Sequence, residues 1–264
     1  MILQNEREDL EVFSFVLGLC FGSFINVLIL RLPLNQSILT RSKCSSCNHL
    51  ISWYHNIPLL SYLYLKGKCS YCNTKISFLY FLVELLSGIV TLSLFLKLGI
   101  TEEFILMCLL SYVLITLSFI DLKYKAVPDY LLLIVFILSF FVTNFSIIES
   151  FKNAFLFCGA FVLLNFVITF YIQNIKSKIL KDETLKNQEA LGVGDIPIIA
   201  LIGIILGLSG GVIAIFLAAF FAIIPSIYSN FIKKDIQTPF IPYLVLGFFT
   251  EYFFNLETFL KAFY

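Results

Sequence analysis

The chain has 264 residues, of which 59% are hydrophobic and only 13% are charged. An ordinary soluble domain has about 45–50% apolar and about 25% charged residues, so the composition excludes that class and indicates a membrane protein with several spans. The net charge of +1 is uninformative because the distribution of charge along the chain matters more; we expect a lipid bilayer, and no nucleic acid, as a partner.

Eight apolar runs approach the length of about twenty residues that a helix needs to cross a bilayer core. They lie at residues 11–31, 78–98, 103–121, 129–148, 153–173, 195–209, 211–231 and 240–260. Residues 209–211, Ser-Gly-Gly, predict a turn between the sixth and seventh runs, and Gly203 and Gly207 predict close helix packing. We therefore predict an all-α integral membrane fold with about eight transmembrane helices.

The polar segments give the orientation and the predicted domains. The two long ones are residues 33–77 and 176–194. If the N-terminus is outside, most of the 18 lysines and arginines fall in inside segments, as the positive-inside rule requires. We therefore predict a first span at 1–32, a cytosolic loop at 33–77 and a seven-span membrane core at 78–264.

Two C-x-x-C pairs lie in the predicted cytosolic loop. They consist of Cys44, Cys47, Cys69 and Cys72. Two such pairs about twenty residues apart are typical of a tetrathiolate zinc site. The pairs also belong to an internal repeat, in which Lys43-Cys44-Ser45 recurs as Lys68-Cys69-Ser70. The alternatives are disulfides, which a reducing cytosol disfavours, redox chemistry and unpaired thiols. Four thiolates leave no open coordination position, so we expect the zinc to be structural.

Two carboxylates are expected at one face of the membrane. Asp121 ends the third run and Asp195 begins the sixth, and these spans cross in opposite directions, so both acids should lie on the cytosolic side. Two carboxylates with separated pKa values can act as aspartic proteases do, one taking a proton from water and the other donating one to the carbonyl oxygen. The alternative is that each acid caps a helix or meets a lysine. Asp129 is a rival to Asp121, although its place at the start of the fourth run is more typical of a helix cap.

Asp195 follows two glycines, Gly192 and Gly194. An acid at the point where the chain enters the membrane is costly and is by default a functional candidate. Glycine allows a close approach of the backbone and a positive φ, so both glycines are expected to support the site around Asp195.

These motifs together resemble the type IV prepilin peptidases, which are bacterial leader peptidases of the GxGD aspartic protease class. The resemblance covers almost the whole chain, and the motifs in this order are far more specific than any one of them. The matching segments are residues 22–27, 31–33, 44–47, 53–61, 69–72, 82–88, 120–121, 127–129, 192–195 and 241–247.

The resemblance implies that Asp121 and Asp195 are the catalytic pair. It implies removal of the short basic leader of prepilins or pseudopilins at the cytosolic face of the bacterial inner membrane. Many members also methylate the new N-terminal residue with S-adenosylmethionine, and the cysteine loop is usually linked to that activity and to zinc.

Several further residues have open roles. Glu84 is an intramembrane acid that binds either the methyl donor or the new amino terminus, or is merely hydrogen-bonded within the bundle. Asn26 and Arg31 orient the loop or the leader, with helix-end anchoring as the alternative for Arg31. Pro197 stands where the family commonly has a lysine. The positive charge that this lysine would place near Asp195 would then have to come from Lys123 or Lys125. No role is assigned to Glu251.

Two other functions compete with a peptidase. One is a non-catalytic, zinc-binding membrane assembly factor, and the other is a proton- or cation-coupled transporter that uses Asp121 and Asp195. A transporter more often has matching halves, and no such repeat occurs outside the cysteine loop. An assembly factor has no reason to keep two acids at one depth beside a double-glycine turn.

Overall fold

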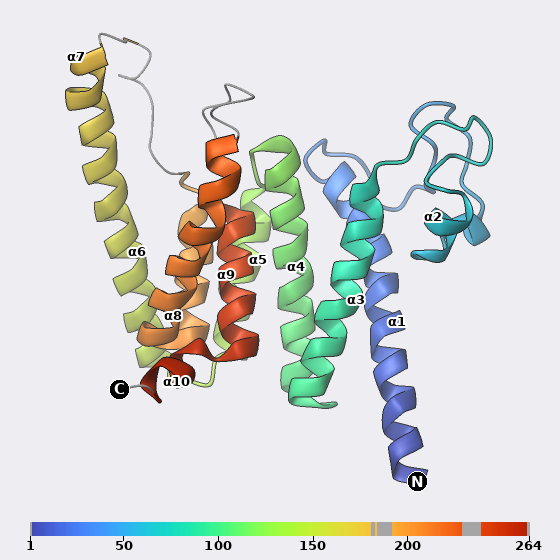
Figure 1. Ribbon diagram of the computed structural model, residues 1–264, viewed down its shortest axis with the longest axis horizontal. Coiled ribbons are helices and arrows are strands. Elements are labelled where there is room, and N and C mark those ends of the chain that lie inside the picture. The colour runs from blue at the N-terminus through green and yellow to red at the C-terminus, as the bar shows by residue number, and fades with distance from the viewer. Residues whose placement is uncertain (1, 181–182, 184–191, 229–238, 263–264) are drawn as a thin grey trace. The chain divides into compact units, whose positions relative to one another are not determined.

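The computed structural model describes residues 2–180, 183, 192–228 and 239–262 (Figure 1). Within these ranges the chain is helical and has no strand, only two isolated β-bridges, so the predicted all-α class is confirmed. The chain divides into two compact units between Tyr124 and Lys125. The sequence-based grouping into a first span, a loop and a seven-span core remains a prediction.

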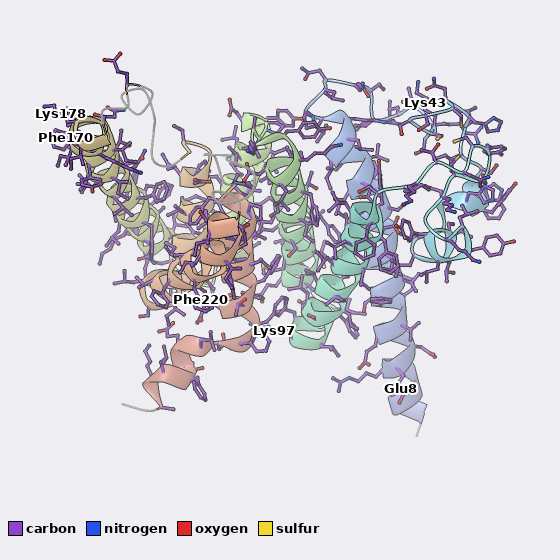
Figure 2. All side chains as sticks on the ribbon, turned by 45° about the horizontal axis from the view of Figure 1, so that its top comes forward. Glu8, Lys43, Lys97, Phe170, Lys178 and Phe220 are labelled. Carbon is purple, nitrogen blue, oxygen red and sulfur yellow. The ribbon has the colours of Figure 1, made fainter. Side chains whose placement is uncertain are left out.

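The N-terminal unit is an antiparallel arrangement of three long helices, which are α1 (Ile2–Arg31), α3 (Phe78–Leu98) and α4 (Glu102–Tyr124) (Figure 1). The cysteine loop, residues 33–77, connects α1 to α3 and contains a short 3₁₀ helix, η1 (Trp53–Asn56), and α2 (Leu60–Tyr64). The Ser77 hydroxyl accepts a hydrogen bond from the Leu79 N–H and so caps α3. Lys43 of the loop lies at one end of this unit, and Glu8 and Lys97 lie at the other (Figure 2).

Glycines bring α1 and α3 unusually close together. A Cβ atom at Gly18 would lie 2.5 Å from the Thr91 Oγ1, and one at Gly22 would lie 2.7 Å from the Cα of Glu84. Side chains larger than hydrogen are therefore excluded at both positions. This pair has the small-xxx-small spacing of helix interfaces, so the sequence itself contains a signal for this packing.

The C-terminal unit contains the remaining helices. They are α5 (Asp129–Val142), α6 (Ile147–Phe170), the π-helical turn η2 (Tyr171–Lys176), α7 (Ser177–Leu180), α8 (Asp195–Tyr228), α9 (Ile241–Phe254) and α10 (Leu256–Lys261). Both α6 and α9 pack against α8. Most of the predicted polar segment 176–194 lies outside the described residues.

Five helices in the described ranges are long and apolar enough to cross a membrane, and α5 and α9 are shorter apolar helices. The predicted sixth and seventh runs both lie in α8, which is interrupted at Gly207 (φ 70°, ψ −167°). A positive φ of this kind is readily accessible only to glycine, so the break falls at Gly207 instead of at residues 209–211. Gly203 does pack closely, since a Cβ atom there would lie 2.5 Å from the Phe157 ring.

Two predicted boundaries are wrong for local reasons. α5 ends at Val142, and the next helix begins after Ser146, whose hydroxyl accepts a hydrogen bond from the Glu149 N–H. α9 ends at Phe254 because Asn255 adopts a left-handed conformation with φ 46°. Both ends depend on capping groups, which an apolar run does not reveal.

The contact between α8 and α9 gives a test of the packing. A Cβ atom at Gly247 would lie 2.2 Å from the Ala214 carbonyl oxygen and 3.0 Å from the Ala218 nitrogen. Because backbone atoms cannot move aside easily, Gly247→Ala should destabilise the protein by about 1–3 kcal/mol. Gly159→Ala is the matched control, since nothing lies within 4 Å of a Cβ atom there, and it should be neutral or stabilising by about 0.5–1 kcal/mol. Equal thermal unfolding temperatures for the two variants in lipid would contradict the packing.

Candidate functional site

The two C-x-x-C segments fold into matching turns. In the first, the Cys44 N–H donates to the His49 carbonyl oxygen (3.0 Å), and the Asn48 N–H donates to the Cys44 carbonyl oxygen (2.9 Å). In the second turn, the Cys69 N–H donates to the Thr74 carbonyl oxygen (2.9 Å), and the Asn73 N–H donates to the Cys69 carbonyl oxygen (3.0 Å). A β-bridge closes each turn, and both asparagines have a φ of 56°. The repeat in the sequence is therefore also a repeat in structure.

The four thiols converge on one point. The Sγ atoms of Cys44, Cys47, Cys69 and Cys72 all lie within 4.8 Å of one another. The Cys44 and Cys72 sulfurs are 3.8 Å apart, which matches the separation of about 3.8 Å in a tetrahedron with zinc–sulfur bonds of about 2.3 Å. All seven cysteines of the chain are free thiols, so the disulfide alternative is not realised. The cluster can hold a metal ion.

The four thiols differ in acidity. Hydrogen bonds from the Thr74 hydroxyl and backbone N–H lower the pKa of Cys72 to about 6. Backbone hydrogen bonds from Cys47 and Ser46 lower the pKa of Cys44. The His49 backbone acts to lower the pKa of Cys47, but desolvation and the neighbouring thiols outweigh it and raise that pKa to about 11. With a pKa of about 6, Cys72 is mainly a thiolate at neutral pH, which is the form that binds a metal.

Metal-free protein should reveal this order of acidity by alkylation. At pH 7 iodoacetamide should modify Cys72 roughly tenfold or more faster than Cys47, because the thiolate is the nucleophile. Lowering the pH to 5, below the Cys72 pKa of about 6, should protonate this thiol and slow its modification. Thr74→Val should also slow it at pH 7 by removing a hydrogen bond, and peptide mass spectrometry reads all three rates. Faster labelling of Cys47 would contradict the assignment.

The two candidate catalytic acids lie at helix ends in different units. Asp121 is in the last turn of α4 and is 8% exposed, and Asp195 is the first residue of α8 and is 5% exposed. Asp129, the rival to Asp121, is in the first turn of α5 and is exposed. Their pairing remains a prediction.

The glycines before Asp195 have a packing role. The Asp195 N–H donates to the Gly192 carbonyl oxygen at 3.2 Å, which makes a tight turn into α8. Neither glycine adopts a positive φ, so conformational freedom, one of the two expected reasons for glycine here, does not apply. A Cβ atom at Gly194 would lie 3.2 Å from Val127, and one at Gly192 would lie 3.5 Å from the Asp195 carboxylate. Close approach is therefore the physical reason for glycine here.

Pro197 lies in the first turn of α8, where the missing N–H has no partner to lose. The Lys123 ammonium lies 4.9 Å from the centroid of the Tyr124 ring, in the N-terminal unit. That Lys123 or Lys125 supplies the positive charge missing at Pro197 remains a prediction.

The N-terminal unit contains three of the candidate residues, and each makes hydrogen bonds there: Glu84, Asn26 and Arg31. The Glu84 carboxylate accepts a hydrogen bond from the Leu59 N–H at 2.9 Å. The Asn26 side chain donates to the Tyr80 carbonyl oxygen at 3.0 Å, which joins α1 to α3. The Arg31 guanidinium donates to carbonyl oxygens of the loop, including those of residues 37 and 40. Arg31 thus holds the start of the cysteine loop.

A cavity of about 520 Å³ lies within the N-terminal unit, between the cysteine loop and the adjoining ends of α1 and α3. Its walls include Arg31, Cys44, Cys69, Tyr80 and Glu84. Pockets of about 300–1,000 Å³ are typical of small-molecule sites. Sequence patterns do not reveal this cavity, because its walls come from α1, the cysteine loop and α3.

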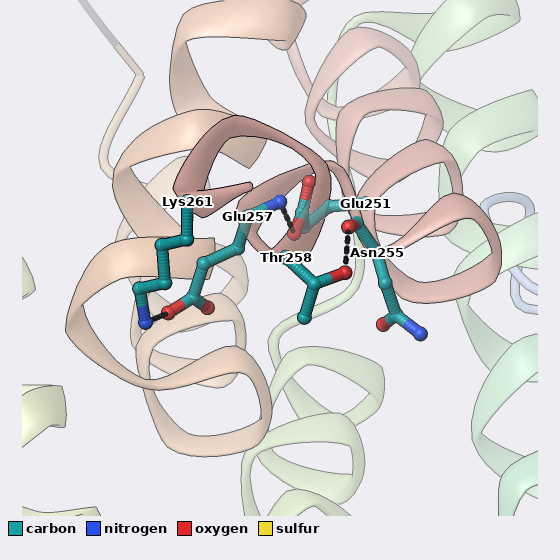
Figure 3. Close-up of polar contacts among 5 residues, drawn as sticks. All are labelled: Glu251, Asn255, Glu257, Thr258 and Lys261. Carbon is teal, nitrogen blue, oxygen red and sulfur yellow. Dashed lines mark hydrogen bonds and ion pairs between the residues drawn. The ribbon is translucent and has the colours of Figure 1, made fainter. Parts of the chain in front are cut away.

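Glu251 has a structural role. It is 3% exposed, and one of its carboxylate oxygens accepts a hydrogen bond from the Glu257 N–H at 3.0 Å (Figure 3). Glu257 pairs in turn with Lys261, and the Thr258 hydroxyl donates to the Asn255 carbonyl oxygen. Glu251 therefore fixes the turn from α9 into α10.

Comparison with known proteins gives consistent matches. The sequence profile of the Bacterial Peptidase A24 N-terminal domain matches residues 16–98, and that of the Type IV leader peptidase family matches residues 108–227. A Vibrio cholerae protein named prepilin leader peptidase/N-methyltransferase is 31% identical over 210 residues, which is 75% of this chain and 78% of the relative.

Two further relatives have the same name. The Pseudomonas putida protein is 28% identical over 259 residues, which cover 88% of this chain and 86% of the relative. The Myxococcus xanthus protein is 45% identical over 118 residues, which cover 44% of this chain and 35% of the relative. No solved structure matches the chain.

Proposed function

The chain belongs to the type IV leader peptidase family, and on that basis we propose that it removes the leader of prepilins or pseudopilins and methylates the new N-terminus. The observation that carries this proposal is the match of both profiles and of a relative that aligns with 75% of this chain. The assembly-factor and transporter functions are not favoured, because the relatives are named for an enzyme with both activities.

Asp121 and Asp195 are the proposed catalytic pair. The ionised carboxylate takes a proton from water, and the water oxygen bonds to the scissile carbonyl carbon. The protonated partner donates its proton to the carbonyl oxygen; collapse of the tetrahedral intermediate then breaks the C–N bond, and the leaving amine takes up a proton. Burial of both acids supports this assignment, since acids at this depth are costly and are usually retained for function.

The enzyme is proposed to lie in the bacterial inner membrane with its N-terminus outside and its active site at the cytosolic face. The distribution of lysine and arginine supports this orientation. The apolar helix of the substrate then remains in the bilayer while its basic leader projects to the catalytic acids.

Methylation is proposed to use S-adenosylmethionine, which supplies a methyl group on a positively charged sulfur. The neutral N-terminal amine takes up the methyl carbon, the sulfonium becomes a thioether and the amine releases one proton. The four cysteines are proposed to hold structural zinc, which their sulfur geometry supports.

A reconstituted assay tests the function. Purified protein in lipid is mixed with a model prepilin, with and without S-adenosylmethionine, and the mass of the mature N-terminus is measured. Loss of a leader is expected in both cases, with one added methyl mass only when the donor is present. Failure to cleave several prepilins, by folded and zinc-loaded protein, would overturn the proposal.

A further inference from the structure

The outer surface of residues 53–64 in the cysteine loop, which contain η1 and α2, is strongly apolar. Trp53 is 78% exposed, Leu60 65%, Leu63 62% and Tyr64 83%. A cluster of large exposed apolar side chains usually marks a contact with a partner protein or with a membrane. We propose that residues 53–64 form an interfacial anchor, which inserts into the lipid leaflet on the side of the membrane where the cysteine loop lies. The inference is independent of the proposed enzymatic function.

The hydrogen bond between Leu59 and Glu84 sets the depth of α2. The membrane-spanning helix α3 has 21 residues, from Phe78 to Leu98, so it is about 31 Å long and matches a hydrocarbon core of about 30 Å. Glu84 lies six residues after Phe78, which is about 9 Å along the helix. Because Glu84 accepts the Leu59 N–H at 2.9 Å, the start of α2 is held at this depth. Figure 1 accordingly shows α2 level with the upper turns of α3.

A second contact holds α2 against α3 and leaves its other face open. The ring centroid of Tyr62 lies 5.5 Å from that of Phe81 and 6.3 Å from that of Phe78. Tyr62 is half-buried by this packing, whereas Leu60 and Leu63 remain exposed. These two leucines are therefore exposed at a level where the surroundings of α3 are lipid instead of water.

The backbone at the start of α2 is suited to lipid, because a bilayer requires polar groups to be satisfied within the protein. Pro58 has no N–H to satisfy, and the Leu59 N–H is taken up by Glu84. The Ser61 N–H donates to the Ile57 carbonyl oxygen at 3.0 Å. Leu59 itself has a φ of 57° and a ψ of −49°, which is costly for a residue with a side chain. On this proposal, Glu84 offsets that cost by accepting a donor that lipid would leave unsatisfied.

The residues around the leucines favour lipid over a protein as the occupant of this surface. Tryptophan and tyrosine are enriched where a membrane meets water, and Trp53 and Tyr64 stand at the two ends of the segment. Lys66 and Lys68 follow directly and are exposed, so their ammonium groups complement the phosphates of lipid headgroups. The Ser61 hydroxyl joins η1 to α2 by donating to the carbonyl oxygen of residue 54 at 3.0 Å. Both short helices thus belong to one anchor.

Trp53 is the only tryptophan of the chain, so its fluorescence reports on the anchor directly. The full chain is reconstituted into nanodiscs of phosphatidylcholine and phosphatidylglycerol, with and without bromine on the acyl chains. We expect emission at shorter wavelengths than that of tryptophan in water, strong quenching by the brominated lipid and weak quenching by iodide in solution. Emission as in water, with quenching by iodide and none by brominated lipid, would overturn the anchor. This measurement needs no variant, so it stands even if a substituted protein misfolds.

The double variant Leu60→Asp/Leu63→Asp should withdraw the segment from the lipid, because two carboxylates are costly to bury in the bilayer. Trp53 emission should then shift to longer wavelengths, lose its quenching by brominated lipid and become accessible to iodide. Leu39→Asp is the matched control, since Leu39 is 92% exposed in the same loop but lies outside the anchor, and its spectrum should equal that of the wild type. An unchanged Trp53 spectrum in the double variant would contradict the proposal.

A protein partner is the competing occupant, and the same fluorescence separates it from lipid. Shielding of Trp53 from iodide that arises only after a model prepilin is added, without quenching by brominated lipid, would assign the surface to the substrate and overturn the anchor. Shielding in nanodiscs without any prepilin is the expected result. Neither outcome depends on whether the protein cleaves or methylates.

Discussion

Asp195→Asn and Asp121→Asn are each expected to lower the rate of leader cleavage by about 10²–10⁴-fold, the range for loss of a general acid or base. Asparagine has nearly the same shape as aspartate but can neither accept nor release a proton in the catalytic range. The protein should therefore remain folded in the membrane while the water is no longer activated. Single-turnover cleavage of a prepilin, read by mass spectrometry, measures the effect.

Asp129→Asn is the matched control for these variants, because Asp129 is an exposed acid in the first turn of a helix and has no place in the proposed chemistry. It should cleave at the wild-type rate. A pilin supplied already cleaved should still be methylated by Asp195→Asn, since Asp195 has no part in the proposed methyl transfer. Cleavage within tenfold of the wild type by either member of the pair would rule out the two-aspartate mechanism.

Cys44→Ser is expected to reduce bound zinc from about one ion per chain to near zero after dialysis. A structural zinc site contributes an apparent binding free energy of about 10–16 kcal/mol, and three thiolates with one hydroxyl bind the ion far less tightly. Without the ion, the two turns lose the centre that holds them together, so the cysteine loop should become sensitive to protease. Elemental analysis gives the metal content, and limited proteolysis reports the loop.

Cys158→Ser is the control, because Cys158 is a single cysteine in α6 and is not part of the cluster. It should retain zinc at the wild-type level. Full zinc content in Cys44→Ser would count against the tetrathiolate site.

The cysteine cluster was the part of the site most open to prediction from sequence. Its four cysteines occur in two short repeats, and each repeat folds through hydrogen bonds between near neighbours such as Asn48 and Cys44. Sequence spacing therefore determines the local geometry almost completely. The helical class was equally accessible, because length and hydropathy alone identify a span.

Features that depend on distant segments were not predicted. The close approach at Gly22 requires knowing that α3 lies against α1, and the bond from Leu59 to Glu84 requires the fold of the loop between them. The helix ends at Val142 and Phe254 depend on caps instead of hydropathy. Glu251 had no assigned role because its partner, the Glu257 N–H, becomes available only when α10 begins there.

The cavity and the cysteine cluster share two residues, since Cys44 and Cys69 belong to the cluster and also line the cavity. A metal ion held by the cluster and a small molecule held in the cavity would therefore act on the same loop. If both stabilise one arrangement of it, thermodynamic linkage requires each to raise the affinity for the other by the same factor. Loss of the metal ion would therefore loosen two of the residues that line the cavity. Leader removal would continue, because its proposed carboxylates are carried by α4 and α8 instead of the loop.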